Sequence, residues 1–349
     1  MTDSSTDSVL GFNMQTRCVE GIYSNEGNPK FLISSSTVKN ENEIYLVQHD
    51  VVMNQASIQS IFPHPQEILH MTTSPHNPAH VFTSTVPNPQ STTSLFVMHE
   101  SAPSRRTGNL QTLFEFPITT PACISPSPSL SSLVALRSTD SVSLWQQKDG
   151  SFVQQESSSH LSQTKSNSYE MCSSWDKDGT RLCVNDSLGI QVFDAKTEYS
   201  VSSLRNIHCG PISSLCFHSI NQNHILSAST DGSLALSDLR NFTAPLAIFF
   251  PHRLRISFLS CNQNGLVLSG ATDGTVNVWD PTTWTLRPDA PETITPLQTV
   301  PTQNSSVTDG TWCMSKHHPF LFLSLSLQGM ANITTLHSSI QSKYISRSH

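Results

Sequence analysis

Two segments of the chain share one order of apolar and polar positions. ILSASTDGSLALSD (225–238) and LVLSGATDGTVNVWD (266–280) each place an apolar run before an Asp-Gly pair and a second apolar run after it. In the later segment, apolar Val276 and Val278 alternate with polar neighbours, which is the two-residue period of a half-buried strand. An Asp-Gly pair between two such runs favours a tight hairpin turn. The pattern therefore predicts a β-hairpin in each segment.

The two hairpins are copies of a longer repeat. Asp231 and Asp273 lie 42 residues apart, and the aspartates that end the two segments, Asp238 and Asp280, have the same spacing. A period of about 40–45 residues with a closing Trp-Asp pair is typical of β-propeller blades. Weaker copies, or strand pairs of similar spacing, lie at 30–50, 79–100, 133–146, 181–194 and 320–336.

These units predict an all-β protein folded as a single seven-bladed WD40 β-propeller. We expect residues 1–9 to be disordered and residues 10–349 to form the propeller. The expected blades lie near 12–60, 61–117, 118–158, 159–205, 206–251, 252–302 and 303–346. Four-stranded blades bury a continuous core and leave only short, protected edges. A C-terminal strand around Lys343-Tyr344-Ile345 is expected to complete the last blade.

Composition and charge narrow the class of protein further. The 349 residues include 19 Lys or Arg and 26 Asp or Glu, and the net charge is −7. Because nucleic-acid affinity depends on clustered cations, this balance argues against a nucleic-acid-binding protein. Only short basic patches occur, at Arg105-Arg106 and Arg253-Leu254-Arg255.

Targeting signals and cysteines indicate the compartment. The N-terminal residues lack the basic and apolar regions of a signal peptide, and no apolar run approaches the ~20 residues that span a bilayer. The eight cysteines form no Cys-x-x-Cys pair and are typical of small buried side chains in a reducing compartment. We therefore expect a cytoplasmic protein without direct membrane insertion, and we expect it to be a monomer.

A set of polar residues recurs in the two clearest blades. Blade six carries His252, Ser269, Asp273 and Trp279, and blade five carries His208, Ser227 and Asp231 without the tryptophan. A Ser/His/Asp trio could indicate nucleophilic catalysis. However, polar groups buried in a blade must be paired, and a catalytic triad has no reason to recur every 42 residues. We interpret the set as a structural relay from histidine through serine and aspartate to the indole N–H.

Other chemical motifs are missing from the sequence. His76 and His80 are separated by a proline that disfavours a helix, and neighbouring His317 and His318 would point apart on a strand. Neither pair has further ligands at zinc-site spacing. Phosphate-binding glycine loops and the Gly-x-Ser-x-Gly motif do not occur. The sequence therefore predicts no catalytic residue, no metal site, no cofactor and no enzymatic activity.

Arg240 is the one candidate partner contact. Asp238-Leu239-Arg240 follows the third strand of blade five, and many WD-repeat substrate receptors offer such an Asp-x-Arg box to the adaptor of cullin-4 ubiquitin ligases. The alternative is that Arg240 pairs with Asp238 or with a neighbouring loop. This motif carries the hypothesis of a cullin-4 substrate receptor.

Segments outside the repeat resemble one family from end to end. They are GFNMQTR (11–17) leading to KFLISSSTVKNENEIYLVQHD (30–50), EILHMTTSPHNPAHVFTS (67–84), the eight-residue step from Asp186 to Asp194, DLRNFTAPL (238–246) and FLFLSLSLQGMANITTLHSSIQSKYIS (320–346). Together they resemble the family of EARP- and GARP-complex-interacting proteins. Departures from the blade pattern are Ser237, Gln146 and Gln328, which stand where Trp, Asp and Asp are usual.

The resemblance implies a non-enzymatic adaptor. Members of that family associate with the multisubunit tethers EARP, in endosomal recycling, and GARP, in endosome-to-Golgi traffic. The resemblance thus implies protein partners that are tether subunits, and a peripheral location on endosomes or the trans-Golgi network through those partners. The cullin-4 substrate receptor remains the alternative function.

Overall fold

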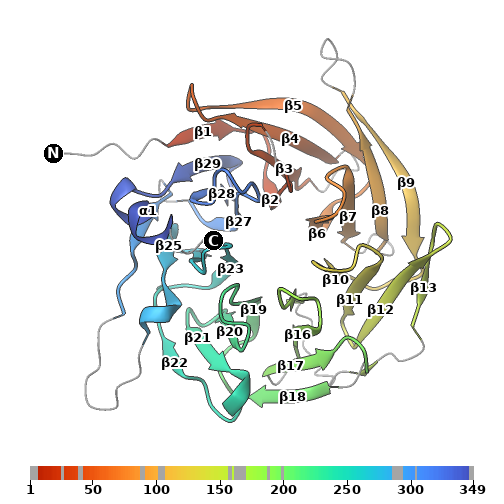
Figure 1. The fold of residues 1–349 in the computed structure, drawn as a ribbon. Helices are drawn as coiled ribbons and strands as arrows, with labels where there is room; N and C mark the ends of the chain where they lie inside the picture. Colours follow the sequence, from red (N-terminus) through yellow and green to blue (C-terminus); the bar gives the residue numbers. More distant parts are fainter. Residues whose placement is uncertain are drawn as a thin grey trace. The chain divides into compact units, whose positions relative to one another are not determined.

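The computed structural model describes residues 7–24, 27–37, 42–86, 91–100, 107–155, 159–160, 170–186, 189–197, 200–284, 294–302 and 305–345. The described residues form seven antiparallel sheets, each built on a path of four strands (Figure 1). The chain divides into two compact units, residues 1–121 with 301–349, and residues 122–300.

The first unit contains three sheets. Their strands are β2 (Thr16–Gly21), β3 (Lys30–Ser35), β4 (Asn42–Asp50) and β5 (Gln55–His64); β6 (Ile68–Thr73), β7 (His80–Thr85), β8 (Thr93–His99) and β9 (Asn109–Phe116); and β27 (Val307–Trp312), β28 (Leu321–Ser326), β29 (Met330–Thr335) and β1 (Ser8–Gly11). The helix α1 (Ser338–Tyr344) follows β29.

The second unit contains four sheets. Their strands are β10 (Ala122–Pro126), β11 (Leu133–Ser138), β12 (Ser141–Lys148) and β13 (Ser151–Gln154), with β14 (Ser159–His160) also paired to β12; β15 (Ser173–Trp175), β16 (Arg181–Asn185), β17 (Gly189–Asp194) and β18 (Ser200–Arg205); β19 (Ile212–Phe217), β20 (His224–Ser229), β21 (Leu234–Asp238) and β22 (Ala247–Phe249); and β23 (Ile256–Cys261), β24 (Val267–Ala271), β25 (Thr275–Trp279) and β26 (Gln298–Pro301). The short 3₁₀ helices η1 (Leu239–Asn241) and η2 (Pro281–Thr283) follow β21 and β25.

Neighbouring sheets pack face to face through their apolar side chains. Within the first unit β2 lies beside β27 and β6, and within the second unit β10, β15, β19 and β23 are neighbours in that order. Each of these contacts brings together the first strands of two successive sheets. Buried apolar clusters lie between sheets rather than inside any one of them, as Leu226 and Leu236 of one sheet with Val267 and Trp279 of the next illustrate. The core is therefore a series of inter-sheet layers.

The N-terminal strand β1 completes the sheet of β27, β28 and β29. It pairs antiparallel with β29, where Ser8 lies opposite Ile333 and Gly11 opposite Met330 (Figure 1). The Ser8 hydroxyl also accepts a hydrogen bond of 3.0 Å from the backbone N–H of Ala56 in β5. The prediction that residues 1–9 are disordered is thus wrong for Ser8 and Val9, while residues 1–6 lie outside the described part of the chain.

The C-terminal residues form a helix where a closing strand was predicted. Lys343 and Tyr344 belong to α1, and Ile345 is its C-cap. The helix begins after His337, whose side chain accepts a hydrogen bond from the backbone N–H of Ser339. Tyr344 is buried, and the apolar Ile340, four positions earlier, lies on the same face of the helix. The strand prediction was wrong because this local helical spacing and cap favour the helix.

The sequence prediction of seven blades is confirmed by the seven sheets. The first sheet ends at His64, beyond the predicted limit of 60, because β4 and β5 are 9 and 10 residues long. The last sheet gains the remote strand β1.

Removal of residues 1–11 is expected to destabilise the protein. The deletion leaves the edge of β29 unpaired, and open strand edges promote association. We expect a lower unfolding temperature and soluble aggregates in size-exclusion chromatography. Deletion of residues 1–6 retains β1 and is the matched control. A deletion of 1–11 that stays as stable and as monodisperse as the control would contradict the role of β1.

Candidate functional site

A chain of hydrogen bonds joins the indole of Trp279 to the turn before β25. The Trp279 Nε1–H donates to the Ser269 hydroxyl over 2.9 Å, and His252 Nε2 lies 2.9 Å from the same hydroxyl. On the other side of the ring, His252 Nδ1 lies 2.9 Å from Thr275 Oγ1 and 3.4 Å from Asp273 Oδ2. The Thr275 hydroxyl donates to Asp273 Oδ1 over 2.6 Å. Five side chains thus form one relay.

The hydrogen-bond pattern fixes the proton positions in the relay. Because the Ser269 oxygen accepts from the indole, its own hydrogen is free to be donated to His252 Nε2. The imidazole then carries its proton on Nδ1 and donates it toward Thr275 and Asp273. Burial lowers the pKa of His252, against the attraction of Asp273, and favours this neutral ring. All donors point toward Asp273, which is the terminal acceptor.

Asp273 also holds the loop that precedes the sheet. Its Oδ2 accepts from the backbone N–H of Arg253 over 2.9 Å, and its Oδ1 accepts from the backbone N–H of Thr275 over 3.0 Å. Burial alone would raise the pKa of Asp273, but these donors and the Thr275 hydroxyl keep it below its usual value. The carboxylate therefore joins the loop of residues 250–255 to the hairpin of β24 and β25.

The order of the predicted relay needs correction. The predicted order has the aspartate between the serine and the indole. In the structure, Ser269 lies between the indole and the imidazole, and Asp273 lies beyond His252. Thr275 was missed. Its signal was present, because a hydroxyl residue follows each Asp-Gly pair, as Thr275 and as Ser233. Such a residue can both bind the aspartate and meet the histidine.

The sheet of β19–β22 repeats the relay without its indole. His208 Nε2 lies 2.8 Å from the Ser227 hydroxyl, and His208 Nδ1 lies 2.5 Å from the Ser233 hydroxyl, which donates to Asp231. Burial lowers the pKa of His208 to about 4, against the attraction of Asp231. Where the other sheet has Trp279, Ser237 is buried, and its hydroxyl has no hydrogen-bond partner in the described structure.

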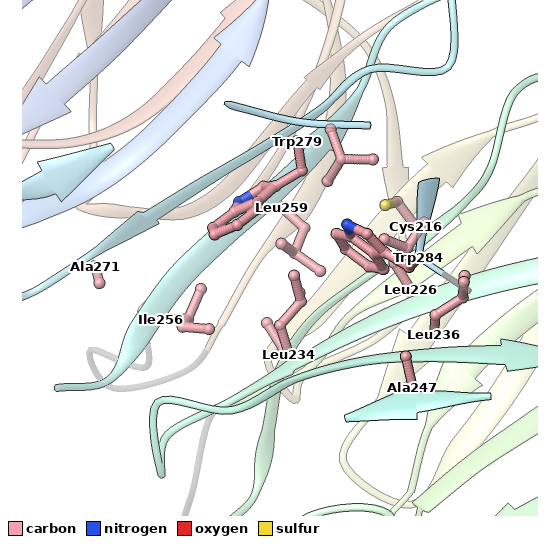
Figure 2. Close-up of a cluster of buried hydrophobic side chains, with 12 residues drawn as sticks. Cys216, Leu226, Leu234, Leu236, Ala247, Ile256, Leu259, Ala271, Trp279 and Trp284 are labelled. Atoms are coloured by element: carbon pink, nitrogen blue, oxygen red, sulfur yellow. The ribbon is translucent and has the colours of Figure 1, made fainter. Parts of the chain in front are cut away.

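Aromatic side chains fill the layer between these two sheets. Figure 2 shows Trp279 and Trp284 beside Leu226, Leu234 and Leu236 of the preceding sheet. The ring centroids of Trp279 and Trp284 lie 6.1 Å apart with an edge-to-face orientation. Phe249 of β22 contacts both rings, at 5.4 and 4.9 Å. Trp284, which lies outside the repeated blade pattern and was not predicted, follows η2 and is a second large aromatic side chain of this layer.

The buried position of the relay argues against catalysis. The side chain of His252 is 0% exposed, and Ser269 is 0% exposed as a residue. A catalytic serine must reach a substrate carbonyl, but this hydroxyl is enclosed by an indole and an imidazole. The relay positions a loop, a hairpin and a tryptophan.

The described residues offer neither a cluster of metal ligands nor a membrane-spanning helix. Across the described ranges, no three or more His, Cys, Asp or Glu side chains are grouped so that they could hold a metal ion. Within those ranges, neither length nor hydropathy qualifies any helix to span a bilayer.

Arg240 lies on η1 and pairs with the aspartate of its own motif. Its Nε lies 3.0 Å from Asp238 Oδ1, and its NH2 nitrogen lies 2.5 Å from Asp238 Oδ2. Asp238 also accepts from the backbone N–H of Arg240 over 2.9 Å, as the N-cap of η1. The Arg240 side chain remains 66% exposed, whereas that of Asp238 is 9% exposed. The pairing orients the guanidinium, and most of its surface faces solvent.

A different set of side chains ties successive sheets together. Asp309 of β27 accepts the backbone N–H of Val19 in β2 over 2.8 Å, and Ser214 of β19 accepts the backbone N–H of Leu259 in β23 over 2.9 Å. Each acceptor follows a bulge at the start of its strand and thereby reaches the next sheet. Burial raises the pKa of Asp309 to about 6, although the N–H groups of Val19 and Gly310 oppose the shift.

The seven four-stranded sheets and the buried polar relay define a WD-type β-propeller. The described residues show no catalytic constellation. This fold generally serves as a scaffold for protein interactions. The chain belongs to the EIPR1 beta-propeller family, whose model matches residues 4–279.

Curated relatives match shorter stretches. The chain is 29% identical over 104 residues to the DDB1- and CUL4-associated factor 11 homolog of Caenorhabditis briggsae, which covers 28% of this chain and 19% of that protein. It is 28% identical over 99 residues to the E3 ubiquitin-protein ligase COP1 of Arabidopsis thaliana, and the match covers 28% of this chain and 14% of that protein. It is 41% identical over 66 residues to the peroxisomal targeting signal 2 receptor of Mus musculus, and the match covers 18% of this chain and 21% of that protein. The chain thus aligns with about a fifth or less of each relative's length.

Trp279→Ala is expected to destabilise the fold by about 3–5 kcal/mol. The change removes a buried aromatic side chain from the layer between two sheets and leaves Ser269 without its indole donor. Trp279→Phe keeps a ring beside Phe249 and Trp284 and should cost less. Urea unfolding at neutral pH measures both variants. A Trp279→Ala protein with wild-type stability that has lost a partner would identify Trp279 as an interface residue instead.

Asp309→Ser is expected to change the pH dependence of stability. Because the folded-state pKa is raised, the wild-type chain gains stability as the pH falls from 7 toward 4, when Asp309 becomes protonated. Serine still accepts the Val19 N–H, as Ser214 does for Leu259. The stability of wild type relative to the variant should rise by on the order of 1–2 kcal/mol over this interval. Thermal unfolding from pH 4.5 to 7.5 measures it.

The control for that experiment is Asp178→Ser, which removes an exposed carboxylate from the turn between β15 and β16. It should leave the slope of stability against pH close to that of the wild type. Equal slopes for the Asp309 and Asp178 variants would show that Asp309 is not the titrating group.

Proposed function

We propose that this protein is a non-enzymatic adaptor of the EARP and GARP vesicle-tethering complexes, acting in endosomal recycling and endosome-to-Golgi traffic. The observation that carries the proposal is the match to the EIPR1 beta-propeller family across residues 4–279. The sequence resemblance over 11–17, 67–84 and 238–246 supports it independently of the repeat.

The architecture supports a binding role rather than a chemical one. The polar side chains that most resemble a catalytic set are enclosed and serve the blades. A propeller instead presents loops and turns on rigid sheets, and loops on such scaffolds commonly carry binding residues. In this proposal the partners are tether subunits, and the protein is a cytoplasmic monomer that reaches endosomes or the trans-Golgi network through them. It requires no cofactor, nucleic acid or membrane insertion.

Affinity purification of the tagged full chain tests the proposal. We expect subunits of EARP or GARP in the eluate, identified by mass spectrometry, and the tagged protein on endosomal membranes by microscopy. Loss of the endosomal signal when a co-purified tether subunit is depleted would support recruitment through that partner. An eluate without tether subunits under mild salt would contradict the adaptor role.

A second candidate function is that of a substrate receptor for a cullin-4 ubiquitin ligase. Two observations favour it: the exposed, oriented guanidinium of Arg240 and the similarity to a DDB1- and CUL4-associated factor 11 homolog. A guanidinium offers a fork of donors suited to carboxylate or carbonyl groups on a partner, a geometry that lysine lacks. In this candidate function Arg240 contacts the ligase adaptor.

Arg240→Ala separates the two functions. If the adaptor function holds, the variant retains EARP or GARP subunits; if the receptor function holds, it loses the ligase adaptor. We expect retention of the tether subunits and a stability change within ~0.5 kcal/mol, since the side chain is exposed. Co-purification and thermal unfolding are the measurements.

The matched control is Lys196→Ala. Lys196 stands two residues after Asp194, as Arg240 does after Asp238, and Asp194 likewise accepts the backbone N–H of that residue. Loss of both sets of partners by Arg240→Ala, with folding intact and the control unaffected, would show that one surface serves both roles.

A further inference from the structure

The loop between β22 and β23 is held at several points. Its buried His252 is part of the relay with Ser269 and Thr275, and the backbone N–H of Arg253 donates to Asp273. At the end of the loop, the backbone carbonyl of Arg255 accepts from the N–H of Thr272 over 2.9 Å. These contacts come from β24, β25 and the turn between them. The loop is therefore pre-organised on the sheet.

The turn of the preceding sheet also packs against this loop. Gly232 has a φ of +84°, and a Cβ placed there would lie 2.7 Å from the carbonyl oxygen of His252 and 3.1 Å from that of Leu254. A larger residue would push the loop away. Two neighbouring sheets of the second unit thus fix the backbone of residues 252–254.

This rigid loop exposes large apolar side chains. Phe250 is 67% exposed and Leu254 is 54% exposed, so most of the apolar surface of these two side chains lies outside the core. By contrast, the adjacent Phe249 contacts Trp279 and Trp284. Exposed aromatic and aliphatic residues on a fixed backbone resemble the anchors of protein interfaces, because little conformational entropy is lost when a partner binds.

Cationic side chains flank the apolar ones. Arg253 is exposed, and among the described residues no carboxylate pairs with its guanidinium. Arg255 is 44% exposed and forms a two-point ion pair with Glu170, at 2.5 and 2.9 Å. Within the part of the chain that the structure describes, Arg253 is thus an exposed cation without a paired carboxylate, and it precedes the exposed Leu254 directly in the sequence.

We propose that residues 250–255 form a docking surface for an acidic amphipathic peptide segment of a partner protein. An apolar side chain of the segment packs on Phe250 and Leu254, and a carboxylate of the segment pairs with Arg253. An anionic membrane does not fit, because recognition of anionic lipid headgroups uses clusters of about 4–8 Lys or Arg. This loop carries Arg253 and Arg255, and Arg255 is already paired with Glu170. The surface rests on the proposed role as an interaction scaffold and holds whether or not the partner is a tether subunit.

Peptide selection on the immobilised full chain tests this surface. The probe is a displayed library of random 16-residue peptides, and we expect the selected pool to be enriched in Asp or Glu together with Leu or Phe. Affinities of selected synthetic peptides are then measured by fluorescence polarisation. Arg253→Glu and Leu254→Ser should each weaken binding at least tenfold, and added salt should weaken it for the wild type.

Lys177→Glu is the matched control, because it makes the same charge change at an exposed position in the turn between β15 and β16. It should retain wild-type affinity, and thermal unfolding of every variant checks that the fold is intact. The proposal is overturned if no acidic amphipathic peptides are selected, or if they bind the Arg253 and Leu254 variants as tightly as the wild type. Binding to vesicles of anionic phospholipid without peptide binding would also overturn it. Because these assays contain no tether subunits, their outcome is independent of the co-purification test.

Discussion

The packing of apolar side chains between neighbouring sheets is the interaction on which this structure depends. A four-stranded antiparallel sheet with apolar residues on both faces cannot be covered by its own side chains. Within each of the two units, neighbouring sheets therefore pack against one another, and the layer of Leu226, Trp279 and Trp284 in the second unit illustrates the result. Because stabilisation scales with the apolar area removed from water, large aromatic residues at these positions contribute most.

Polar contacts determine how the sheets and loops are joined. The relay through His252, Ser269 and Asp273 satisfies groups that burial would otherwise leave unpaired, and it fixes a loop to a hairpin. Asp309 and Ser214 make the same contact with the next sheet through different chemistry. The carboxylate of Asp309 is a stronger hydrogen-bond acceptor than the hydroxyl of Ser214. Because burial raises the pKa of Asp309, its hydrogen bond from Val19 is sensitive to pH.

The same rigidity that stabilises the sheets prepares their loops for partners. Asp238 orients Arg240 on η1, and Asp273 holds the loop that carries Phe250 and Leu254. In both places a buried or nearly buried carboxylate fixes backbone, and an exposed side chain remains available. This arrangement is consistent with an interaction scaffold, because function is carried by particular side chains presented on a fold that many proteins share.

The amino-acid sequence by itself determined the repeat, the strand hairpins and four of the five members of the relay, all except Thr275. Asp-Gly turns and the two-residue period are local features, so residues such as Asp273 and Val276 reveal their role without knowledge of the fold. Contacts between remote segments were decided only by the tertiary structure. The strand β1 reaches β29 across more than 300 residues, Asp309 meets Val19, and Ser269 rather than Asp273 contacts the indole. No local pattern encodes these choices, because each depends on which surfaces the folded sheets bring within hydrogen-bonding distance.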